Sequence, residues 1–389
     1  MIGKRFRALG LMSGTSMDGI DAALVETDGA RVFALLPART DPYDGIFRDR
    51  LRAALGPGPA DSDLARDLTE RHAATIRRLL ADAGLRPADV DVVGFHGHTV
   101  RHDPKQGVTR QIGDGEMLAR LVAIPVVADF RRCDVAEGGE GAPLAPLYHA
   151  ARALDLEKPI AVLNLGGVAN VTWIGVGAGA GAGIGVGAGA GAGIGANGVL
   201  IAFDTGPGNA LLDDWVRATI GRAMDEDGRL ARAGRPDAAM LRVLLADGYF
   251  RRPPPKSLDR DHFAQTLAAV KSLSPADGAA TLARFTACAA ALARAHFPEP
   301  PRRWLVAGGG RRNGYLMSQL ADVLGENVVP VEDVGWRGDF LEAEAFAFLA
   351  VRSLLGLALS LPTTTGVRAP CPGGTLHLPP GGRRPDGRK

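Results

Sequence analysis

Two copies of one local pattern constrain the fold of this chain more than any other feature. In each copy, two extended apolar segments flank a short glycine-rich polar turn: SGTSMDG follows Phe6 to Met12, and the second copy is IAVLNLGGVANVTW. Gly, Ser, Thr and Asp favour tight turns, so each copy predicts a β-hairpin. A chain of 389 residues is long enough for two domains that each bury a core. We therefore predict two domains, with the same hairpin device used twice along the chain.

Apolar periodicity around the hairpins predicts alternating helices and strands, which is typical of the α/β class. Helical spacing occurs around 64–83, 116–121, 209–215, 279–295, 315–324 and 342–357, and strand-like apolar runs occur around 90–95, 123–129, 199–203 and 304–307. The runs at 90–95 and 123–129, with helical spacing between them, predict parallel strands joined by a helical crossover. We place the first domain at 1–157 and the second at 158–361, with 362–389 returning to the first.

A low-complexity segment at 175–195 interrupts the second domain. It contains the decapeptide GVGAGAGAGI twice in identical form, with too few side chains to build a core. We interpret it as an inserted loop that lengthens a hairpin and expect it to be dispensable for activity. The tail from Gly373 is rich in Pro, Gly and basic residues, and we expect it to be mobile.

Charge and cysteine content limit the classes of partner. Lys and Arg number 45 against 43 for Asp and Glu, so no basic footprint for nucleic acid or anionic lipid is indicated. The uncharged run at 159–203 is mostly Gly and Ala, which argues against a membrane span. Ser13, Gly14 and Asp18 interrupt the N-terminal apolar stretch, so we expect no signal peptide and a cytoplasmic location. The three cysteines form no CxxC pair, and their spacing predicts neither a disulfide framework nor a thiolate zinc site.

Three glycine-rich turns follow strand-like runs and are candidate phosphate sites. They are Ser13 to Ser16, Gly166 with Gly167, and Gly308 to Gly310. Glycine lets backbone N–H groups approach a phosphate closely, and neighbouring hydroxyls add donors. Any one of them could equally be a plain tight turn. Three such turns in two similar halves favour a nucleotide.

Asp204 is the strongest candidate for acid–base chemistry. It follows an apolar strand and enters a loop with Gly206, and a carboxylate at the end of a strand can act as a general base on a hydroxyl or water. An ordinary Asx turn explains the residue equally well on local sequence. Arg131, with Arg132 and Asp134, could orient a substrate or form a surface ion pair.

The histidines His96, His98 and His102 support a rival hypothesis, a metal-dependent hydrolase, because alternate histidines on a strand can ligate one metal. No HExxH motif occurs, and Gly97 and Thr99 favour a polar loop at this segment.

Motifs that run nearly end to end through the chain resemble those of the anhydro-N-acetylmuramic acid kinase family, part of the superfamily of acetate and sugar kinases, Hsp70 and actin. They are GLMSGTSMDGID at 10–21, HGHTVRHDP at 96–104, QIGDG at 111–115, ADFRRCDVAEGGEGAPLAP at 128–146, LNLGGVANVT at 163–172, FDTGPGNALLDDW at 203–215, PPPKSLDRDHF at 253–263, VAGGGRRNGYLM at 306–317 and LEAEAFAFLA at 341–350. His98 and Glu140 depart from the family pattern, which has glutamine at both places.

This resemblance implies an actin-like, ribonuclease H-like ATPase fold, in which two domains are built on related mixed sheets flanked by helices. ATP and sugar would meet in a cleft between the domains, and the doubled hairpin agrees with this fold. The implied reaction opens the 1,6-anhydro ring with water and transfers the ATP γ-phosphate to O6. ATP and Mg²⁺ are the implied cofactors, with no protein ligand assigned to the metal. The implied partners are the amino sugar and ATP, with a homodimer also suggested and neither nucleic acid nor membrane expected.

The resemblance also assigns site residues. Asp204 would be the general base that activates water for attack at C1. The sugar would contact His96, Thr99, Arg131, Gly206, Asn209 and Glu342. The ATP phosphates and adenosine would contact Gly14, Thr15, Ser16, Met17, Asp18, Gly19, Ile20, Asp21, Asn164, Gly166, Gly167, Gly308, Gly309, Gly310 and Asn313.

Three alternatives remain open beside this interpretation. An ordinary sugar kinase of the same superfamily would phosphorylate a free hydroxyl without opening a ring. The metal-dependent hydrolase would not need ATP, and a nucleotide-binding switch of the Hsp70 or actin kind would form no sugar product.

Overall fold

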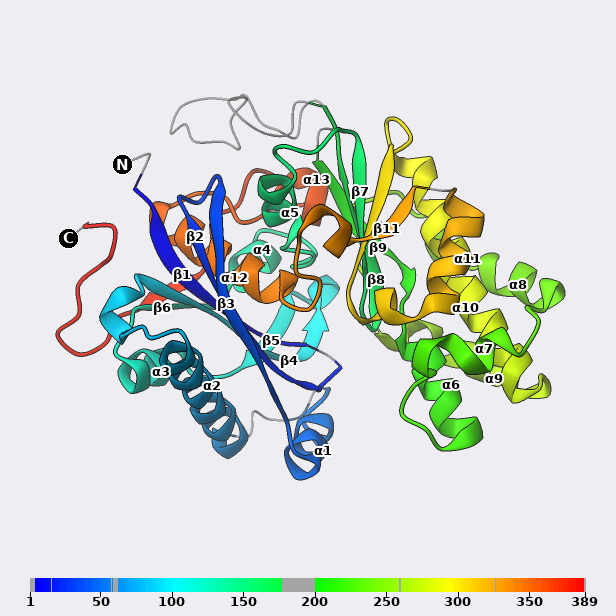
Figure 1. The fold of residues 1–389 in the computed structure, drawn as a ribbon, viewed down its shortest axis with the longest axis horizontal. Coiled ribbons are helices and arrows are strands. Elements are labelled where there is room, and N and C mark those ends of the chain that lie inside the picture. Colours follow the sequence, from blue (N-terminus) through cyan, green and yellow to red (C-terminus); the bar gives the residue numbers. More distant parts are fainter. Residues whose placement is uncertain are drawn as a thin grey trace. The chain divides into compact units, whose positions relative to one another are not determined.

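The computed structural model describes residues 4–14, 16–56, 58, 62–176, 200–258, 260–325 and 327–387. The chain divides into two compact units (Figure 1). Among the described residues, unit 1 is formed by the chain up to Asp155 and from Phe340 onward, and unit 2 by Leu156–Val176 and the chain from Leu200 to Asp339.

Unit 1 is built on a mixed sheet with the strand order β12-β6-β4-β1-β2-β3, and β5 pairs with β4. Its strands are β1 (Phe6–Ser13), β2 (Gly19–Thr27), β3 (Val32–Pro42), β4 (Val92–Asp103), β5 (Val108–Ile112), β6 (Val126–Ala128) and β12 (Thr375–His377). Its helices are α1 (Gly45–Ala53), α2 (Ser62–Asp82), α3 (Gly115–Val122), α4 (Arg132–Ala136), α5 (Pro146–Arg152), α12 (Leu341–Leu355) and α13 (Pro362–Thr365). The first hairpin, β1 with β2, is confirmed, as is the parallel pair β4 and β6 with α3 between them.

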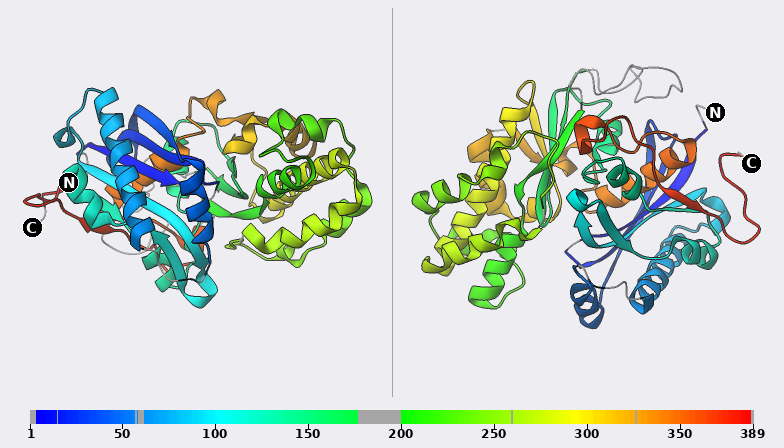
Figure 2. Two further views of the ribbon diagram at one scale, coloured as in Figure 1. Left: turned by 90° about the horizontal axis from the view of Figure 1, so that it is seen from below. Right: turned by 180° about the vertical axis from the view of Figure 1, so that it is seen from behind.

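Unit 2 is built on a sheet with the order β11-β10-β7-β8-β9. Its strands are β7 (Ile160–Leu165), β8 (Val168–Ile174), β9 (Leu200–Pro207), β10 (Arg303–Ala307) and β11 (Val328–Pro330). Its helices are α6 (Ala210–Ile220), α7 (Arg229–Arg232), α8 (Ala238–Leu245), α9 (Ala264–Ala269), α10 (Pro275–Leu292) and α11 (Gly314–Leu324). Apolar residues of α6, α10 and α11 form one core with this sheet, and Figure 2 shows the helices gathered beside it.

The two sheets share one topology. In unit 1, β3, β2 and β1 are successively antiparallel, and β4 and β6 follow β1 in parallel. In unit 2, β9, β8 and β7 are successively antiparallel, and β10 and β11 follow β7 in parallel. The predicted fold class, two related mixed sheets flanked by helices, is confirmed.

The two faces of the unit 1 sheet carry different side chains, because neighbouring residues of a strand point to opposite faces. Leu9 and Leu11 belong to the core that α2 and α3 cover. Gly10 of β1 pairs with Gly94 of β4, and a Cβ at either position would overlap a backbone carbonyl of α12. The glycine pair therefore lets α12 lie against the opposite face of the sheet.

The position of α12 corrects the expected domain boundary. We placed 341–361 in the second domain, whereas the chain from Phe340 onward belongs to unit 1. The reason is the close packing of α12 on β1 and β4, which joins partners far apart in the sequence.

Other local expectations differ from the structure. The strand β9 continues to Pro207, so Asp204 and Gly206 lie in a paired strand instead of a loop. The polar loop expected at the histidine cluster is part of β4. The tail expected to be mobile contains β12, which pairs with β6. The repeat connects β8 to β9, and its residues from 177 on lie outside the described ones. In the described part of the chain, no helix is long and apolar enough to cross a membrane.

The substitution Gly10→Ala should lower the free energy of unfolding by at least about 2 kcal/mol, because the new methyl group would overlap the Ala343 carbonyl. Urea denaturation followed by circular dichroism measures this change. Gly45→Ala is the matched control, because a Cβ there meets no atom within 4 Å and alanine favours helix. Equal stability of the two variants would contradict the packing of α12 on the sheet.

Candidate functional site

The first glycine-rich turn joins β1 to β2 in unit 1. The Met17 N–H donates to the Gly14 carbonyl oxygen at 3.0 Å, and Met17 adopts a left-handed φ of 58°. Among the described residues, a Cβ built on Gly14 would meet only Ser16 Oγ, at 3.6 Å, so these residues leave one side of the turn open. Asp18 is exposed on the same turn, and Thr15 lies outside the described residues. This geometry leaves room for a ligand beside the backbone of the turn.

Three predicted phosphate contacts lie in β2 and not in the turn. Gly19 packs closely on the backbone of β3, and Ile20 is buried in the core of unit 1. The Asp21 carboxylate accepts a hydrogen bond from Thr40 Oγ1 at 2.6 Å. The structure therefore gives Gly19 and Ile20 a packing role.

A buried hydrogen-bond chain connects this turn to β4. The Tyr43 hydroxyl donates to Ser13 Oγ at 2.8 Å, and Ser13 Oγ lies 3.0 Å from His98 Nδ1. Ser13 Oγ thus accepts from Tyr43 and is linked through His98 to β4. Burial lowers the pKa of His98 to about 4, so its ring is neutral near pH 7. His98 therefore anchors the first turn instead of presenting a charge.

His96, two residues earlier in β4, orients Arg131. His96 Nδ1 donates to the Gly97 carbonyl oxygen at 3.0 Å, which leaves Nε2 to accept from Arg131 Nε at 3.0 Å. Burial, with a smaller contribution from the Arg131 charge, lowers the pKa of His96 well below its ordinary value. Arg131 also donates to the Gly141 carbonyl oxygen at 3.3 Å. A neutral imidazole thus fixes the direction of a guanidinium.

Asp134 follows Arg131 on α4 and is a buried structural residue, which corrects the surface ion pair considered from the sequence. Its carboxylate accepts from the Gly141 N–H and from Thr365 Oγ1, both at 2.6 Å. It therefore links α4 to α13. The neighbouring Arg132 does form an exposed ion pair, with Asp129.

Two further predicted sugar contacts lie near these groups. Thr99 Oγ1 accepts from Gln111 Nε2 at 3.1 Å across the β4–β5 pair. Glu342 lies in the first turn of α12 with an exposed side chain, within electrostatic range of Arg131 and Asp21. The structure thus gathers Arg131, Glu342 and His96 in one part of unit 1.

Each of the three histidines of the rival hypothesis has its own partner. His96 contacts Arg131 and His98 contacts Ser13, as described above, and His102 Nδ1 pairs with Thr109 Oγ1 at 3.1 Å. Within the described ranges, no three His, Cys, Asp or Glu side chains are grouped so as to hold a metal ion. The geometry gives the metal-dependent hydrolase no support.

In unit 2, two glycine-rich turns and the β9–α6 loop come together. The Asn209 N–H donates to the Gly166 carbonyl oxygen at 2.7 Å, and its side-chain Nδ2 donates to the Leu165 carbonyl oxygen at 3.0 Å. Gly308 has a left-handed φ of 74°, and a Cβ there would lie 2.6 Å from the Leu165 carbonyl oxygen. These close approaches hold all three loops at one edge of the sheet.

The outer side of the same turns is open. A Cβ built on Gly166 would meet nothing closer than 3.4 Å, and one on Gly309 would meet only Asn209 Nδ2 at 3.7 Å. Gly310 is buried and packs on Leu165. The turns therefore expose glycine backbone on the side away from the sheet.

A row of polar residues crosses the strands below these turns. Asn164 of β7 pairs with Asn170 of β8, which pairs with Asp204 of β9. Directly opposite residues in neighbouring antiparallel strands point to the same face. Sequence reasoning missed Asn170, although its place in the second hairpin mirrors that of Asn164 across the turn.

Asp204 is 7% exposed, and residues of the segment 249–258 hold it in place. Its N–H donates to the Lys256 carbonyl oxygen at 3.0 Å, and its Oδ2 accepts from the Leu258 N–H at 2.8 Å. The Tyr249 hydroxyl donates to the Asp204 carbonyl oxygen at 2.6 Å. Backbone and carboxylate are thus both oriented. The signal for Lys256 and Leu258 was the family segment PPPKSLDRDHF, from which no residue was chosen.

Lys256 places a buried amine close to this carboxylate-bearing strand. Its Nζ donates to the Tyr249 carbonyl oxygen at 3.2 Å and lies 4.7 Å from the centre of the Tyr249 ring. Burial lowers the pKa of Lys256 to about 8. The side chain thus stabilises the segment that orients Asp204.

Two other predicted contacts have structural roles. Asn313 caps α11, because its side chain accepts from the Leu316 N–H at 2.9 Å. Gly206 packs on α10, where a Cβ would lie 2.9 Å from Ala289 Cβ. The structure gives Gly206 no open side toward a ligand.

Stability should fall as pH falls from 6.5 toward 4. Burial lowers the pKa of His72 and His98 to about 4 and that of His149 to about 3, from 6.5. In this range the unfolded chain binds more protons than the native one, so the free energy of unfolding decreases. Urea denaturation at pH 7.5 and 5 measures the loss. Between pH 7.5 and 5, the free energy of unfolding of the variant His72→Phe should fall less than that of the parent. An identical fall would contradict the lowered pKa of His72.

Comparison with known proteins identifies the family of the chain. A family model described as anhydro-N-acetylmuramic acid kinase matches residues 6–193 and 187–378. The chain is 56% identical over 373 residues to the anhydro-N-acetylmuramic acid kinase of Rhodospirillum rubrum, with 95% of this chain and 93% of the relative covered. It is 53% identical over 374 residues to that of Paramagnetospirillum magneticum, with 96% and 99% covered. The resemblance found in the sequence motifs is confirmed, and this chain belongs to the anhydro-N-acetylmuramic acid kinase family.

Proposed function

We propose that this protein uses ATP and water to convert 1,6-anhydro-N-acetylmuramic acid into N-acetylmuramic acid 6-phosphate, a step in the recycling of cell-wall peptidoglycan. The observation that carries this proposal is the 56% identity to a kinase of this name over nearly the whole chain. Because the reaction consumes ATP, we place it in the cytoplasm. The homodimer that the resemblance suggests stays a prediction.

Asp204 is the proposed general base. It would take a proton from water as the water oxygen attacks C1; the C1–O6 bond then breaks, and O6 becomes the phosphoryl acceptor. The Leu258 N–H fixes the plane of the carboxylate, and Tyr249 with Lys256 fixes its backbone. A base in a rigid frame needs no reorganisation when the proton moves.

The open glycine turns are the proposed contacts for the ATP phosphates. Gly166 and Gly309 in unit 2 and the Gly14 turn in unit 1 can offer backbone N–H groups without side-chain obstruction, and Gly167 and Gly308 of the same turns stay predicted contacts. This fit supports a role for the predicted turns but not for Gly19 and Ile20, which are packed.

Mg²⁺ is proposed to bind with the nucleotide. The described residues offer no group of three metal-ligating side chains, so phosphate oxygens and water would supply most of its ligands. When bound, the ion would neutralise charge on the phosphates.

Arg131 is the proposed anchor for the carboxylate of the muramic acid side chain. A guanidinium recognises a carboxylate with paired hydrogen bonds. His96 orients Arg131, and Thr99 and Glu342 lie on neighbouring elements of unit 1. Asn209 is proposed to act on the substrate indirectly, by holding the turn at Gly166 and Gly167 through its hydrogen bond to the Leu165 carbonyl oxygen.

Mass spectrometry of the product tests the proposed reaction. After incubation with anhydro-N-acetylmuramic acid, Mg-ATP and ¹⁸O-labelled water, and a prompt reading before anomeric exchange, we expect a phosphorylated sugar with the label at C1. Phosphorylation only of sugars without the anhydro ring would favour an ordinary sugar kinase. Hydrolysis without ATP would contradict both.

The substitution Asp204→Asn should lower kcat by about 10²–10⁴-fold, because an amide cannot take the proton from water. ATP binding should be largely retained, since the amide oxygen can still accept from the Leu258 N–H. Steady-state kinetics and calorimetric titration with ATP measure the two effects. Asp214→Asn, which removes an exposed ion pair with Arg217, is the matched control and should behave like the parent. Near-normal turnover of Asp204→Asn would remove this residue from its role.

A further inference from the structure

Two cysteines that are far apart in the sequence meet in unit 1. Their spacing predicts no disulfide framework, yet Cys133 Sγ and Cys371 Sγ lie 3.3 Å apart, and both are free thiols. Cys133 lies on α4, and Cys371 pairs with Ser360 in an isolated β-bridge. A disulfide needs an S–S separation of about 2.05 Å, so the sulfurs have to approach by a little over 1 Å when the bond forms.

The hydrogen bonds of the pair distinguish the two sulfurs. Cys371 donates its S–H to the Pro372 carbonyl oxygen at 3.1 Å, so the Cys133 S–H is the one that donates to Cys371 Sγ. Burial, together with the contact to Cys133, raises the pKa of Cys371 to about 12. Since thiolates react with peroxides and thiols hardly do, Cys371 is a poor first target.

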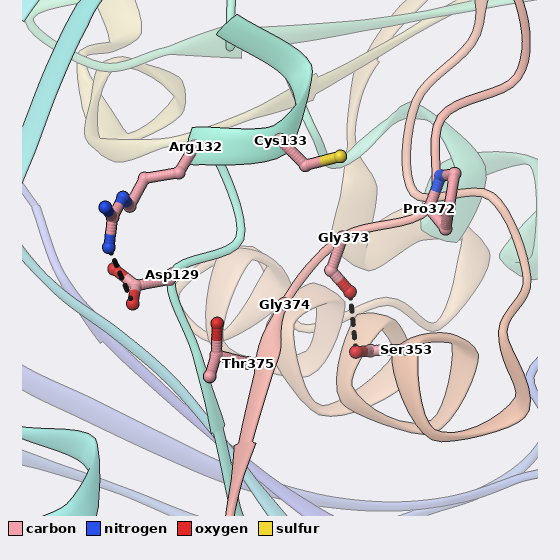
Figure 3. A pocket seen from close by; sticks show the side chains of 8 residues that line it. All are labelled: Asp129, Arg132, Cys133, Ser353, Pro372, Gly373, Gly374 and Thr375. Atoms are coloured by element: carbon pink, nitrogen blue, oxygen red, sulfur yellow. Dashed lines mark hydrogen bonds and ion pairs between the residues drawn. The ribbon is translucent and has the colours of Figure 1, made fainter. Parts of the chain in front are cut away.

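A surface pocket of about 590 Å³ gives access to Cys133. Figure 3 shows the Cys133 side chain at this pocket, pointing toward the segment that carries Pro372. The pocket is also lined by Arg132 and by residues 372–375, and none of its lining residues belongs to the sites assigned above. Cys371 is only 4% exposed and does not line it. A small oxidant can therefore reach Cys133 before Cys371.

We propose that Cys133 and Cys371 form an oxidation site that closes to an intramolecular disulfide when the protein meets hydrogen peroxide. Cys133 sulfur attacks one peroxide oxygen, the O–O bond breaks, and the other oxygen leaves as water, which gives a sulfenic acid. Cys371 sulfur then attacks Cys133 sulfur, the S–O bond breaks, and a second water carries away the thiol proton. Two thiols are oxidised by two electrons while one peroxide is reduced to two waters.

Thiol counting and peptide mapping test this site in the intact protein. After treatment with hydrogen peroxide in slight excess, the number of reactive thiols counted in the unfolded chain should fall from three to one. Dithiothreitol should restore all three. Mass spectrometry without reduction should show one peptide pair joined through Cys133 and Cys371. A disulfide between two chains, or sulfinic acid at Cys133 with Cys371 still free, would overturn the proposal.

Two variants test the order of the steps. In Cys371→Ser, oxidation should stop at the sulfenic acid of Cys133, and dimedone should label that residue. Cys288→Ser is the matched control, because it removes the third thiol, on α10 of unit 2, and should still form the disulfide. Absence of dimedone label on folded Cys371→Ser, with a disulfide forming in the parent, would contradict Cys133 as the first target. The parent measurement stands even if Cys371→Ser does not fold.

Discussion

Contact between the backbone of α12 and two paired glycines determines how unit 1 is assembled. Gly10 and Gly94 are neighbours on parallel strands, and no side chain separates them from the helix. A few residues further on, the same strands carry Ser13 and the histidines of β4. The helix also brings Glu342 within electrostatic range of Arg131. One close packing contact therefore positions most of the groups that we propose for the sugar.

Unit 2 repeats the sheet topology but uses glycine differently. Here the close approaches occur between loops: Gly208, Gly308 and Gly310 contact the turn after β7 or the Asn209 side chain. Parallel strands place their carboxyl ends at one edge of a sheet, so β7 and β10 deliver their turns together. In unit 1 the glycines of the sheet thus admit a helix, whereas in unit 2 glycines bring three loops together at one edge of the sheet.

Local patterns predicted the hairpins, the crossover helix and the glycine turns, because each depends on neighbouring residues. Long-range contacts were not predictable in this way. The place of α12, the strand β12 and the contact between Cys133 and Cys371 all join segments separated by most of the chain. Asp204 was found from its motif, whereas its partners Tyr249 and Leu258 became visible only in the fold. The site residues could be proposed from the sequence, but not the interactions that orient them.

The way in which Arg131 is held bears on what it can bind. The neutral His96 ring orients the guanidinium without cancelling its charge, and the Glu342 carboxylate lies within electrostatic range of the same group. His96 stays neutral because protonation would bury a second positive charge beside Arg131, in a place without solvent. Burial of His96 therefore keeps its ring available as the acceptor that directs Arg131. The same acceptor would hold Arg131 in position for the sugar carboxylate that we propose as its ligand.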